Sequence, residues 1–203
     1  MKKILIVLAV IAIIWYSCTP HVSRVKNVGN SGWQIVAIGD SLTYGKGAKP
    51  EESYPSLLEK ALDRSVLNLG HNGETAVQGA QRIKQALYSD PYMVLIEFGG
   101  NDYIQSTRFE DTIAAVEQMV NAVQEAGAVA VIVDTGGSYV MGSYTKYYKK
   151  IAQEKGAVYV SGILNGIMGK KELMSDKVHP NAKGYAIIAK KIEKEILPYL
   201  HKK

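Results

Sequence analysis

The sequence predicts a three-layer α/β/α domain built on a five-stranded parallel sheet of the flavodoxin-like kind. Five short apolar segments are separated by longer stretches in which apolar residues recur near helical spacing. Most of the apolar segments are followed directly by Gly, Asp or Asn, which are typical of the loops after strands. Because strands that alternate with helices imply crossover connections, we expect the strands to run parallel and the helices to cover both faces of the sheet.

The expected strands are short and consist mainly of aliphatic residues. The first is the run Ile-Val-Ala-Ile, which Gly39 and Asp40 end, and the last is the brief Val-Tyr-Val segment. Apolar runs of this length favour strands that are buried on both faces. In chain order the strands are predicted over residues 35–38, 66–69, 93–98, 129–133 and 158–160.

The stretches between these strands carry apolar residues three or four positions apart, as amphipathic helices do. In chain order, helices are predicted over residues 54–63, 75–88, 109–126, 143–155 and 182–200. Each predicted strand is therefore followed by one helix, which is the alternation that a covered parallel sheet requires.

The length and composition fit one globular domain. The chain has 203 residues, of which 47% are hydrophobic and 21% are charged. Lys2 and Lys3 of the 24 basic residues belong to the N-terminal leader, so the rest of the chain carries 22 basic against 19 acidic residues, a balance of +3. This excess is too small to indicate a nucleic-acid-binding protein, and no nucleic-acid partner is expected.

The first residues are typical of a secretory signal. Lys2 and Lys3 precede an unbroken apolar run over residues 4–16, which is short for a bilayer span but suits the core of a signal sequence. Cys18 closely follows the run, and as the only cysteine it cannot form an internal disulfide. We therefore expect an exported protein with a signal over 1–17, a tether without apolar periodicity over 18–33, and one globular domain over 34–203.

The leader resembles a bacterial lipoprotein signal, in which the cysteine is lipidated and becomes the new N-terminus. The resemblance implies lipidation of Cys18 and a membrane-tethered protein in the bacterial periplasm or at the cell surface. An uncleaved anchor and plain secretion are the alternatives, because Trp15 and Tyr16 stand where such signals usually carry Leu and a small residue.

Polar residues gather where the predicted strands end. Ser41 follows the first strand, a Gly-containing stretch over 70–73 follows the second, and Asn101 follows the third. In parallel α/β sheets ligands bind outside the carboxyl ends of the strands. All three segments are therefore expected on the ligand-binding edge.

A serine, a base and a carboxylate are available for nucleophilic acyl transfer. Pro180 disfavours a helical conformation at His179, so Asp176 and His179 are expected on an extended loop before the last helix, where the carboxylate can fold back to the ring. A serine hydroxyl needs a base to take its proton and an acid to orient that base, so the pattern indicates a triad of Ser41, His179 and Asp176. Taken alone, each residue is more simply interpreted as a cap, turn or loop residue; their co-occurrence on one predicted edge favours catalysis.

Four ordered sequence blocks carry a resemblance to a known family. They are Gly-Asp-Ser-Leu around Ser41, Asn-Leu-Gly-His-Asn-Gly-Glu-Thr around Gly73, Gly-Gly-Asn-Asp around Asn101, and the segment that holds Asp176 and His179. With these blocks in this order, the chain is identified as a member of the SGNH hydrolase superfamily, also called the GDSL esterases and lipases. The block Glu-Phe-Gly-Gly-Asn-Asp most resembles the bacterial arylesterase, thioesterase and lysophospholipase subgroup.

The resemblance implies the SGNH hydrolase fold and hydrolysis of acyl esters through an acyl-enzyme, with Ser41 as nucleophile, His179 as base and Asp176 as acid. It also implies an oxyanion hole made by the N–H groups of Ser41 and Gly73 and the side-chain amide of Asn101. Such donors are needed because negative charge grows on the carbonyl oxygen during attack. Side chains near these blocks are expected to shape the substrate pocket, namely Tyr103, Ile104, Tyr139, Val140 and Met141.

Other sites fit the sequence less well. The sequence has no Gly-x-Ser-x-Gly, phosphate-binding loop or Rossmann glycine fingerprint, and its histidines lack metal-ligand spacing, so no metal and no cofactor are expected. Asp134, after the fourth predicted strand, is the rival for the acid role, although a turn residue is the simpler interpretation. Asp40 is expected to hold the turn beside the nucleophile. Glu97 is expected to support the neighbouring loop through hydrogen bonds, because an unpaired buried carboxylate is costly.

The predicted substrate is a small-molecule, lipid or glycan acyl ester. Within enzymes, the alternative is a carbohydrate or peptidoglycan O-acetylesterase, which a surface-tethered location would suit. The alternative from another class is a lipoprotein that binds an acylated ligand without turnover. Such a protein has no need of an activated nucleophile, so the combination of Ser41, His179 and Asp176 argues against it.

Overall fold

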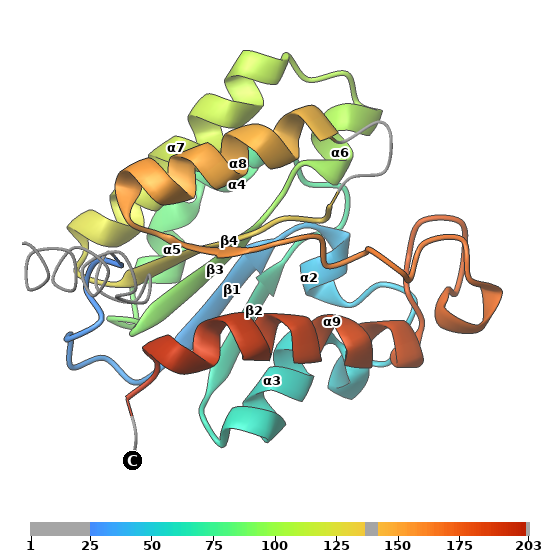
Figure 1. Ribbon diagram of the computed structural model, residues 1–203, viewed down its shortest axis with the longest axis horizontal. Helices are drawn as coiled ribbons and strands as arrows, with labels where there is room; N and C mark the ends of the chain where they lie inside the picture. The colour runs from blue at the N-terminus through green and yellow to red at the C-terminus, as the bar shows by residue number, and fades with distance from the viewer. Residues whose placement is uncertain (1–24, 137–141, 202–203) are drawn as a thin grey trace, which may run out of the picture.

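The computed structural model describes residues 25–136 and 142–201 and confirms the predicted fold (Figure 1). Within these residues, five strands form one sheet in which every neighbouring pair is parallel, in the order β2-β1-β3-β4-β5. This is the flavodoxin-like strand order. The strands are β1 (Ile35–Gly39), β2 (Val66–Gly70), β3 (Met93–Glu97), β4 (Val129–Val133) and β5 (Val158–Val160).

Helices lie on both faces of the sheet. The described α-helices are α2 (Ser41–Tyr44), α3 (Tyr54–Leu62), α4 (Ala76–Gln81), α5 (Ile83–Leu87), α6 (Gly100–Ile104), α7 (Phe109–Glu125), α8 (Gly142–Lys155) and α9 (Ala182–Ile196). The described 3₁₀ turns are η2 (Pro50–Glu52), η3 (Lys171–Leu173) and η4 (Leu197–Tyr199). In Figure 1, α3 and α9 cover one face and pack on each other, whereas α4, α5, α7 and α8 cover the opposite face.

Side chains alternate between the two faces along each strand. In β1, Ile35 and Ala37 pack in the layer with α3 and α9, whereas Val36 and Ile38 pack in the layer with α4, α5, α7 and α8. All four side chains are fully buried. Burial on both faces explains why the strands appear in the sequence as continuous apolar runs.

Four helical regions differ from the prediction. The stretch predicted as one helix over 75–88 is two helices, α4 and α5, separated at Arg82, whose guanidinium reaches Glu74 and the carbonyl oxygen of Leu69. The last helix ends at Ile196 because Pro198 disfavours its continuation, and η4 follows. The helices α2 and α6, of 4 and 5 residues, are too short to show apolar periodicity in the sequence.

Residues 25–30, which we call the amino-edge strap, are hydrogen-bonded across the edge where the strands begin. The N–H of Lys26 donates to the carbonyl oxygen of Gly156 at 3.0 Å. The Asn27 side-chain amide donates to the carbonyl oxygens of Gln124 at 2.9 Å and Ala128 at 3.0 Å. This part of the predicted tether is therefore fixed to the domain.

The end of the strap also meets the C-terminal segment. The Asn30 amide donates to the carbonyl oxygen of Tyr92 at 3.1 Å, and Nε2 of His201 lies 2.7 Å from the carbonyl oxygen of Asn30. The two ends of the described chain thus lie together at the amino edge, as Figure 1 shows. None of the helices in the described part of the chain has the length and apolarity that a bilayer crossing needs.

Candidate active site

The nucleophile candidate lies at the turn between β1 and α2. Ser41 is the first residue of α2 and follows Asp40, whose Oδ1 accepts a 2.9 Å hydrogen bond from the N–H of Leu42 and so caps the helix. A Cβ atom at Gly39 would lie only 2.1 Å from Oγ1 of Thr43. Glycine at this position lets α2 fold back closely on the end of β1, which presents Ser41 at the carboxyl edge of the sheet.

The loop before α9 holds the candidate base and acid. The N–H of Ser175 donates to the carbonyl oxygen of His179 at 2.9 Å, which closes the loop on itself. Immediately after it, Oδ1 of Asn181 accepts hydrogen bonds from the N–H groups of Lys183 at 3.0 Å and Gly184 at 3.2 Å, which caps α9. The loop is therefore fixed at both ends.

Asp176, His179 and Ser41 form a continuous hydrogen-bonded line. Nδ1 of His179 lies 2.7 Å from Oδ2 of Asp176, and Nε2 lies 3.1 Å from Oγ of Ser41. The other oxygen of Asp176 accepts hydrogen bonds from the N–H groups of Val178 and His179, both at 2.8 Å. The Val178 N–H and the His179 ring lower the pKa of Asp176 to about 2, so its carboxylate is charged and can orient the imidazole.

The rival acid, Asp134, has a different set of partners. Its Oδ1 accepts a 2.9 Å hydrogen bond from the N–H of Gly136. Its Oδ2 accepts hydrogen bonds from the hydroxyls of Thr145 at 2.9 Å and Tyr159 at 2.6 Å. Asp134 therefore ties the end of β4 to α8 and β5, while His179 has its carboxylate partner in the loop before α9.

The two remaining blocks meet Ser41 at one cavity, which Gly73 and Asn101 line with it. Gly73 has a φ of +79°, a left-handed conformation that favours glycine, and open space where a Cβ would stand. The Asn101 amide nitrogen donates to Oδ2 of Asp40 at 3.0 Å and to the carbonyl oxygen of Glu74 at 3.1 Å. Both of its N–H groups are thus engaged, and donation to an oxyanion requires one of these bonds to be exchanged.

A buried carboxylate next to Asn101 joins the two sequence blocks that hold Gly73 and Asn101. Asp102 is fully buried and accepts hydrogen bonds from the N–H of Ala76 at 2.9 Å and the hydroxyl of Thr112 at 3.0 Å. Burial raises the pKa of Asp102. Sequence analysis did not identify this residue, although its place in the Gly-Gly-Asn-Asp block was an available signal.

Two further carboxyl groups lie beneath the nucleophile. Glu97 accepts a 3.0 Å hydrogen bond from Oγ1 of Thr43, which also lies 2.8 Å from the hydroxyl of Tyr54. Burial and then the like charge of Asp40 keep the pKa of Glu97 well above its usual range, and burial raises the pKa of Asp40 to about 6. Glu97 thus supports α2 from the end of β3, and Asp40 holds the turn.

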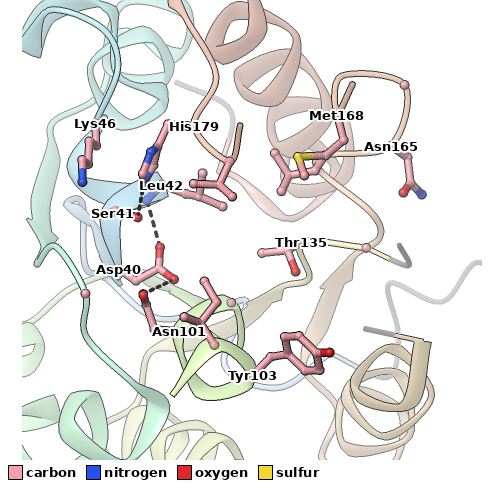
Figure 2. Close-up of a pocket in the computed structure, with 17 residues that line it drawn as sticks. Asp40, Ser41, Leu42, Lys46, Asn101, Tyr103, Thr135, Asn165, Met168 and His179 are labelled. Carbon is pink, nitrogen blue, oxygen red and sulfur yellow. Dashed lines mark hydrogen bonds between the residues drawn. The ribbon is translucent and has the colours of Figure 1, made fainter. Parts of the chain in front are cut away.

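A cavity of about 540 Å³ opens in front of the reacting groups (Figure 2). Figure 2 shows Lys46 next to His179 above Ser41, with Met168 at the upper right and Tyr103 at the lower right. The cavity wall is largely apolar, and its larger apolar members are Leu42, Tyr103, Ile104, Leu164, Met168 and Val178.

The predicted pocket residues fall into two groups. Tyr103 and Ile104 line the cavity, whereas Tyr139, Val140 and Met141 lie outside the described residues, as does Cys18. Sequence analysis missed the contribution of residues 164–168, which follow β5 in a loop and carry no periodic signal. Across residues 25–136 and 142–201, no three His, Cys, Asp or Glu side chains form a group that could hold a metal ion.

Known proteins resemble the chain over most of this domain. A family model described as GDSL-like lipase/acylhydrolase matches residues 37–187. The arylesterase of Vibrio mimicus is 27% identical over 179 residues, which cover 82% of this chain and 90% of the relative. Thioesterase 1/protease 1/lysophospholipase L1 of Escherichia coli strain K12 is 26% identical over 176 residues, which cover 82% of this chain and 85% of the relative.

The fold agrees with these sequence relationships. The crystal structure of TesA superposes with a TM-score of 0.76 and 22% sequence identity, over 82% of this chain and 99% of that chain. The matched family span contains all the residues that the sequence singled out at the carboxyl edge, Ser41, Gly73, Asn101, Asp176 and His179. The chain therefore belongs to the GDSL-like lipase/acylhydrolase family, the SGNH hydrolases, and is an enzyme that hydrolyses ester bonds.

Proposed function

We propose that the protein hydrolyses acyl esters of the arylesterase, lysophospholipase or thioesterase type through an acyl-enzyme on Ser41. The observation that carries this proposal is the line of hydrogen bonds from Asp176 through His179 to Ser41, at 2.7 and 3.1 Å, beside the cavity. The relatives named arylesterase and thioesterase/lysophospholipase support the substrate range.

In the first half-reaction, Nε2 of His179 takes the Ser41 hydroxyl proton while Oγ bonds to the carbonyl carbon of the ester. The carbonyl oxygen becomes an oxyanion, for which the N–H groups of Ser41 and Gly73 and the amide of Asn101 are the proposed donors. The bond from carbon to the leaving oxygen then breaks, and His179 gives its proton to that oxygen. Asp176 remains ionised and stabilises the imidazolium during these steps.

In the second half-reaction, water attacks the acyl carbon and one of its protons passes to Nε2 of His179. The bond between the acyl carbon and Oγ of Ser41 breaks, and the proton returns to Oγ. One water is consumed for each ester, and the products are the carboxylic acid and the alcohol or thiol. The enzyme ends in its starting state, so no other reactant is needed.

Substitution of the nucleophile tests this mechanism. Ser41→Ala should lower kcat by about 10⁴-fold or more, because nucleophile and base act as a unit, and His179→Ala should cost a similar factor. A fluorophosphonate probe should label the wild-type protein at Ser41 alone. Urea unfolding of both variants should remain close to that of the wild type. Labelling at another serine, or an active Ser41→Ala protein, would contradict the triad assignment.

We also propose that the leader exports the protein and that lipidated Cys18 tethers it to a membrane of a bacterial periplasm or surface. The apolar run over residues 4–16 and the cysteine that closely follows it support this location. The described chain begins at the amino edge (Figure 1), whereas the cavity is lined by residues at the carboxyl edge. Residues 19–24 reach at most about 20 Å when fully extended, and β1 with its following turn places Ser41 about 20 Å beyond the amino edge. A protein tethered in this way would hold its cavity facing away from that membrane.

This orientation favours a second candidate, a carbohydrate or peptidoglycan O-acetylesterase, because such substrates lie outside the bilayer. A series of p-nitrophenyl esters from acetate to palmitate separates the candidates. A maximum of kcat/KM at acetate supports the O-acetylesterase, and a maximum at longer chains supports the lysophospholipase or thioesterase type. Membership of a hydrolase family argues against a lipoprotein that only binds an acylated ligand.

A further inference from the structure

The cavity contains a charged side chain that the proposed mechanism does not use. Lys46 is exposed and lines the cavity together with Ser41 and His179. Asp40, the carboxylate that also lines the cavity, is 2% exposed and already accepts hydrogen bonds from Leu42 and Asn101. Throughout the described ranges, the Lys46 ammonium has no ion pair or side-chain hydrogen bond. It is therefore a cation available to a bound molecule.

The backbone of Lys46 is held at a fixed place relative to the nucleophile. Its N–H donates to the carbonyl oxygen of Ser41 at 2.9 Å. Its own carbonyl oxygen accepts a 2.8 Å hydrogen bond from the hydroxyl of Tyr185, a fully buried residue of α9. The side chain thus extends into the cavity from a rigid base, which limits the positions that its charge can occupy.

The cavity differs in character on the two sides of Ser41. Figure 2 places Lys46 next to His179 and to the left of Ser41, whereas Tyr103 and Met168 lie to the right of Ser41. The leaving oxygen must lie near His179, because that ring hands it a proton. The apolar side therefore suits the acyl chain, and the side that holds Lys46 suits the alcohol portion of the ester.

We propose that Lys46 forms an anion-binding subsite, so that the preferred esters carry a phosphate or a carboxylate on their alcohol portion. The inference rests on the proposed reaction at Ser41 and names the substrate class for it. A lysine ammonium binds such groups as a compact point charge.

Matched ester pairs test the proposal in the full-length protein. One pair is the hexanoyl ester of glycerol 3-phosphate against monohexanoylglycerol, and the other is O-acetylated glucuronic acid against O-acetylated glucose. The measured quantity is the ratio of kcat/KM for the anionic ester to that for its neutral partner. Lys46→Met should lower this ratio about tenfold, the value of one charge-assisted hydrogen bond, and Lys46→Arg should restore much of it. The pair that responds more strongly identifies phosphate or carboxylate as the better ligand.

Two controls distinguish an effect of Lys46 in the cavity from an effect of the overall positive charge of the protein. Lys190→Met removes an exposed lysine of α9 that does not line the cavity, and it should leave the ratio unchanged. Raising the salt from about 0.05 to 0.5 M should lower the wild-type ratio more than that of Lys46→Met. If neutral esters are hydrolysed, two results would overturn the anion-binding subsite. One is an unchanged ratio in Lys46→Met, and the other is a fall in Lys190→Met as large as that in Lys46→Met. Failure of the wild type to hydrolyse every ester would instead overturn the reaction at Ser41.

Discussion

The amino and carboxyl edges of the sheet differ in the kind of polar groups that they hold. At the amino edge, the strap over residues 25–30 donates N–H groups to backbone carbonyl oxygens, with Asn27 and Asn30 supplying the side-chain amides. At the carboxyl edge, Asp40, Glu97 and Asp102 are buried carboxyl groups, and the pKa of each is raised by burial. The hydrogen bonds of the amino edge join neutral groups and therefore carry little electrostatic cost. The carboxyl edge instead holds three buried carboxyl groups whose ionisation is disfavoured.

The costly groups at the carboxyl edge all adjoin the reacting residues. Asp40 contacts the Asn101 amide, Asp102 joins the two sequence blocks that hold Gly73 and Asn101, and Glu97 supports α2 through Thr43. Buried, hydrogen-bonded groups of this kind hold donors in place before substrate arrives, which is what electrostatic stabilisation of a transition state requires. The amino edge therefore contributes stability, whereas the carboxyl edge holds the buried groups that position Ser41 and Asn101.

The largest effect in this comparison is expected at Asn101. Asn101→Ala should lower kcat by about 10² to 10³ with a smaller change in KM, because its amide binds charge that appears only in the transition state. Some activity should remain, since the N–H groups of Ser41 and Gly73 are kept. Steady-state kinetics with a p-nitrophenyl ester provide the measurement. A raised KM with unchanged kcat would place Asn101 in ground-state binding instead.

At the amino edge, Asn27→Ala should affect stability and leave the kinetics intact. Asn27 has a φ of +64° and makes two side-chain hydrogen bonds to the domain. Loss of these bonds, together with alanine in a left-handed conformation, should lower the free energy of unfolding by about 2–3 kcal/mol. Urea unfolding measures the change.

Asn27→Gly is the matched control for this prediction, because glycine tolerates the left-handed conformation but cannot make the two hydrogen bonds. It should therefore cost less than Asn27→Ala. A fall in kcat/KM of either variant under conditions where it remains folded would show that the amino edge is not independent of the active site.

A smaller effect is expected in the pH dependence of stability. The raised pKa of Glu97 means that its stabilising contribution is present below its ordinary value of 4.5 and is lost as the pH rises toward its folded value. Glu97→Gln, which retains an acceptor for Thr43, should therefore make the free energy of unfolding fall less as the pH rises above 4.5. Asp176 behaves in the opposite sense, because with a pKa of about 2 its contribution is lost only on strong acidification. Equal pH slopes for Glu97→Gln and wild type would refute this account of Glu97.

The smallest effect is expected on access to substrates in the membrane, and it tests whether the tether and the cavity lie at opposite edges of the sheet. Insertion of a Gly-Ser linker of about 20 residues after Arg24 gives a mean reach of roughly 25 Å beyond the native tether. In membranes from a bacterial host, it should raise hydrolysis of a bilayer-embedded acyl ester a few-fold and leave hydrolysis of p-nitrophenyl acetate unchanged. Cys18→Ala should release the protein and abolish labelling by palmitate. Equal access to the embedded ester with the native and lengthened tethers would contradict the proposed orientation.

Much of the fold was predictable because its signals are local. Apolar runs such as Ile-Val-Ala-Ile and the helical spacing between them establish alternating strands and helices, and the structure confirms a parallel sheet. The break at Arg82 was not predictable, because the guanidinium of Arg82 reaches Glu74 and Leu69, whereas Gly79, the glycine of this stretch, remains inside α4. The helices α2 and α6 were not predicted, because they are too short to show apolar periodicity in the sequence.

The sequence by itself determined the sheet, the order of the four blocks and the choice of Ser41, His179 and Asp176 as candidates for catalysis, because periodicity and motif spacing are properties of neighbouring positions. Only the tertiary structure decided what those residues meet. It brings His179 to Ser41 across 138 positions of the chain and gives Asp134 to Thr145 and Tyr159. It also engages both N–H groups of Asn101 and places Lys46 at the same cavity as Ser41. Cavities and buried hydrogen bonds form between segments distant in sequence, and no local pattern encodes their geometry.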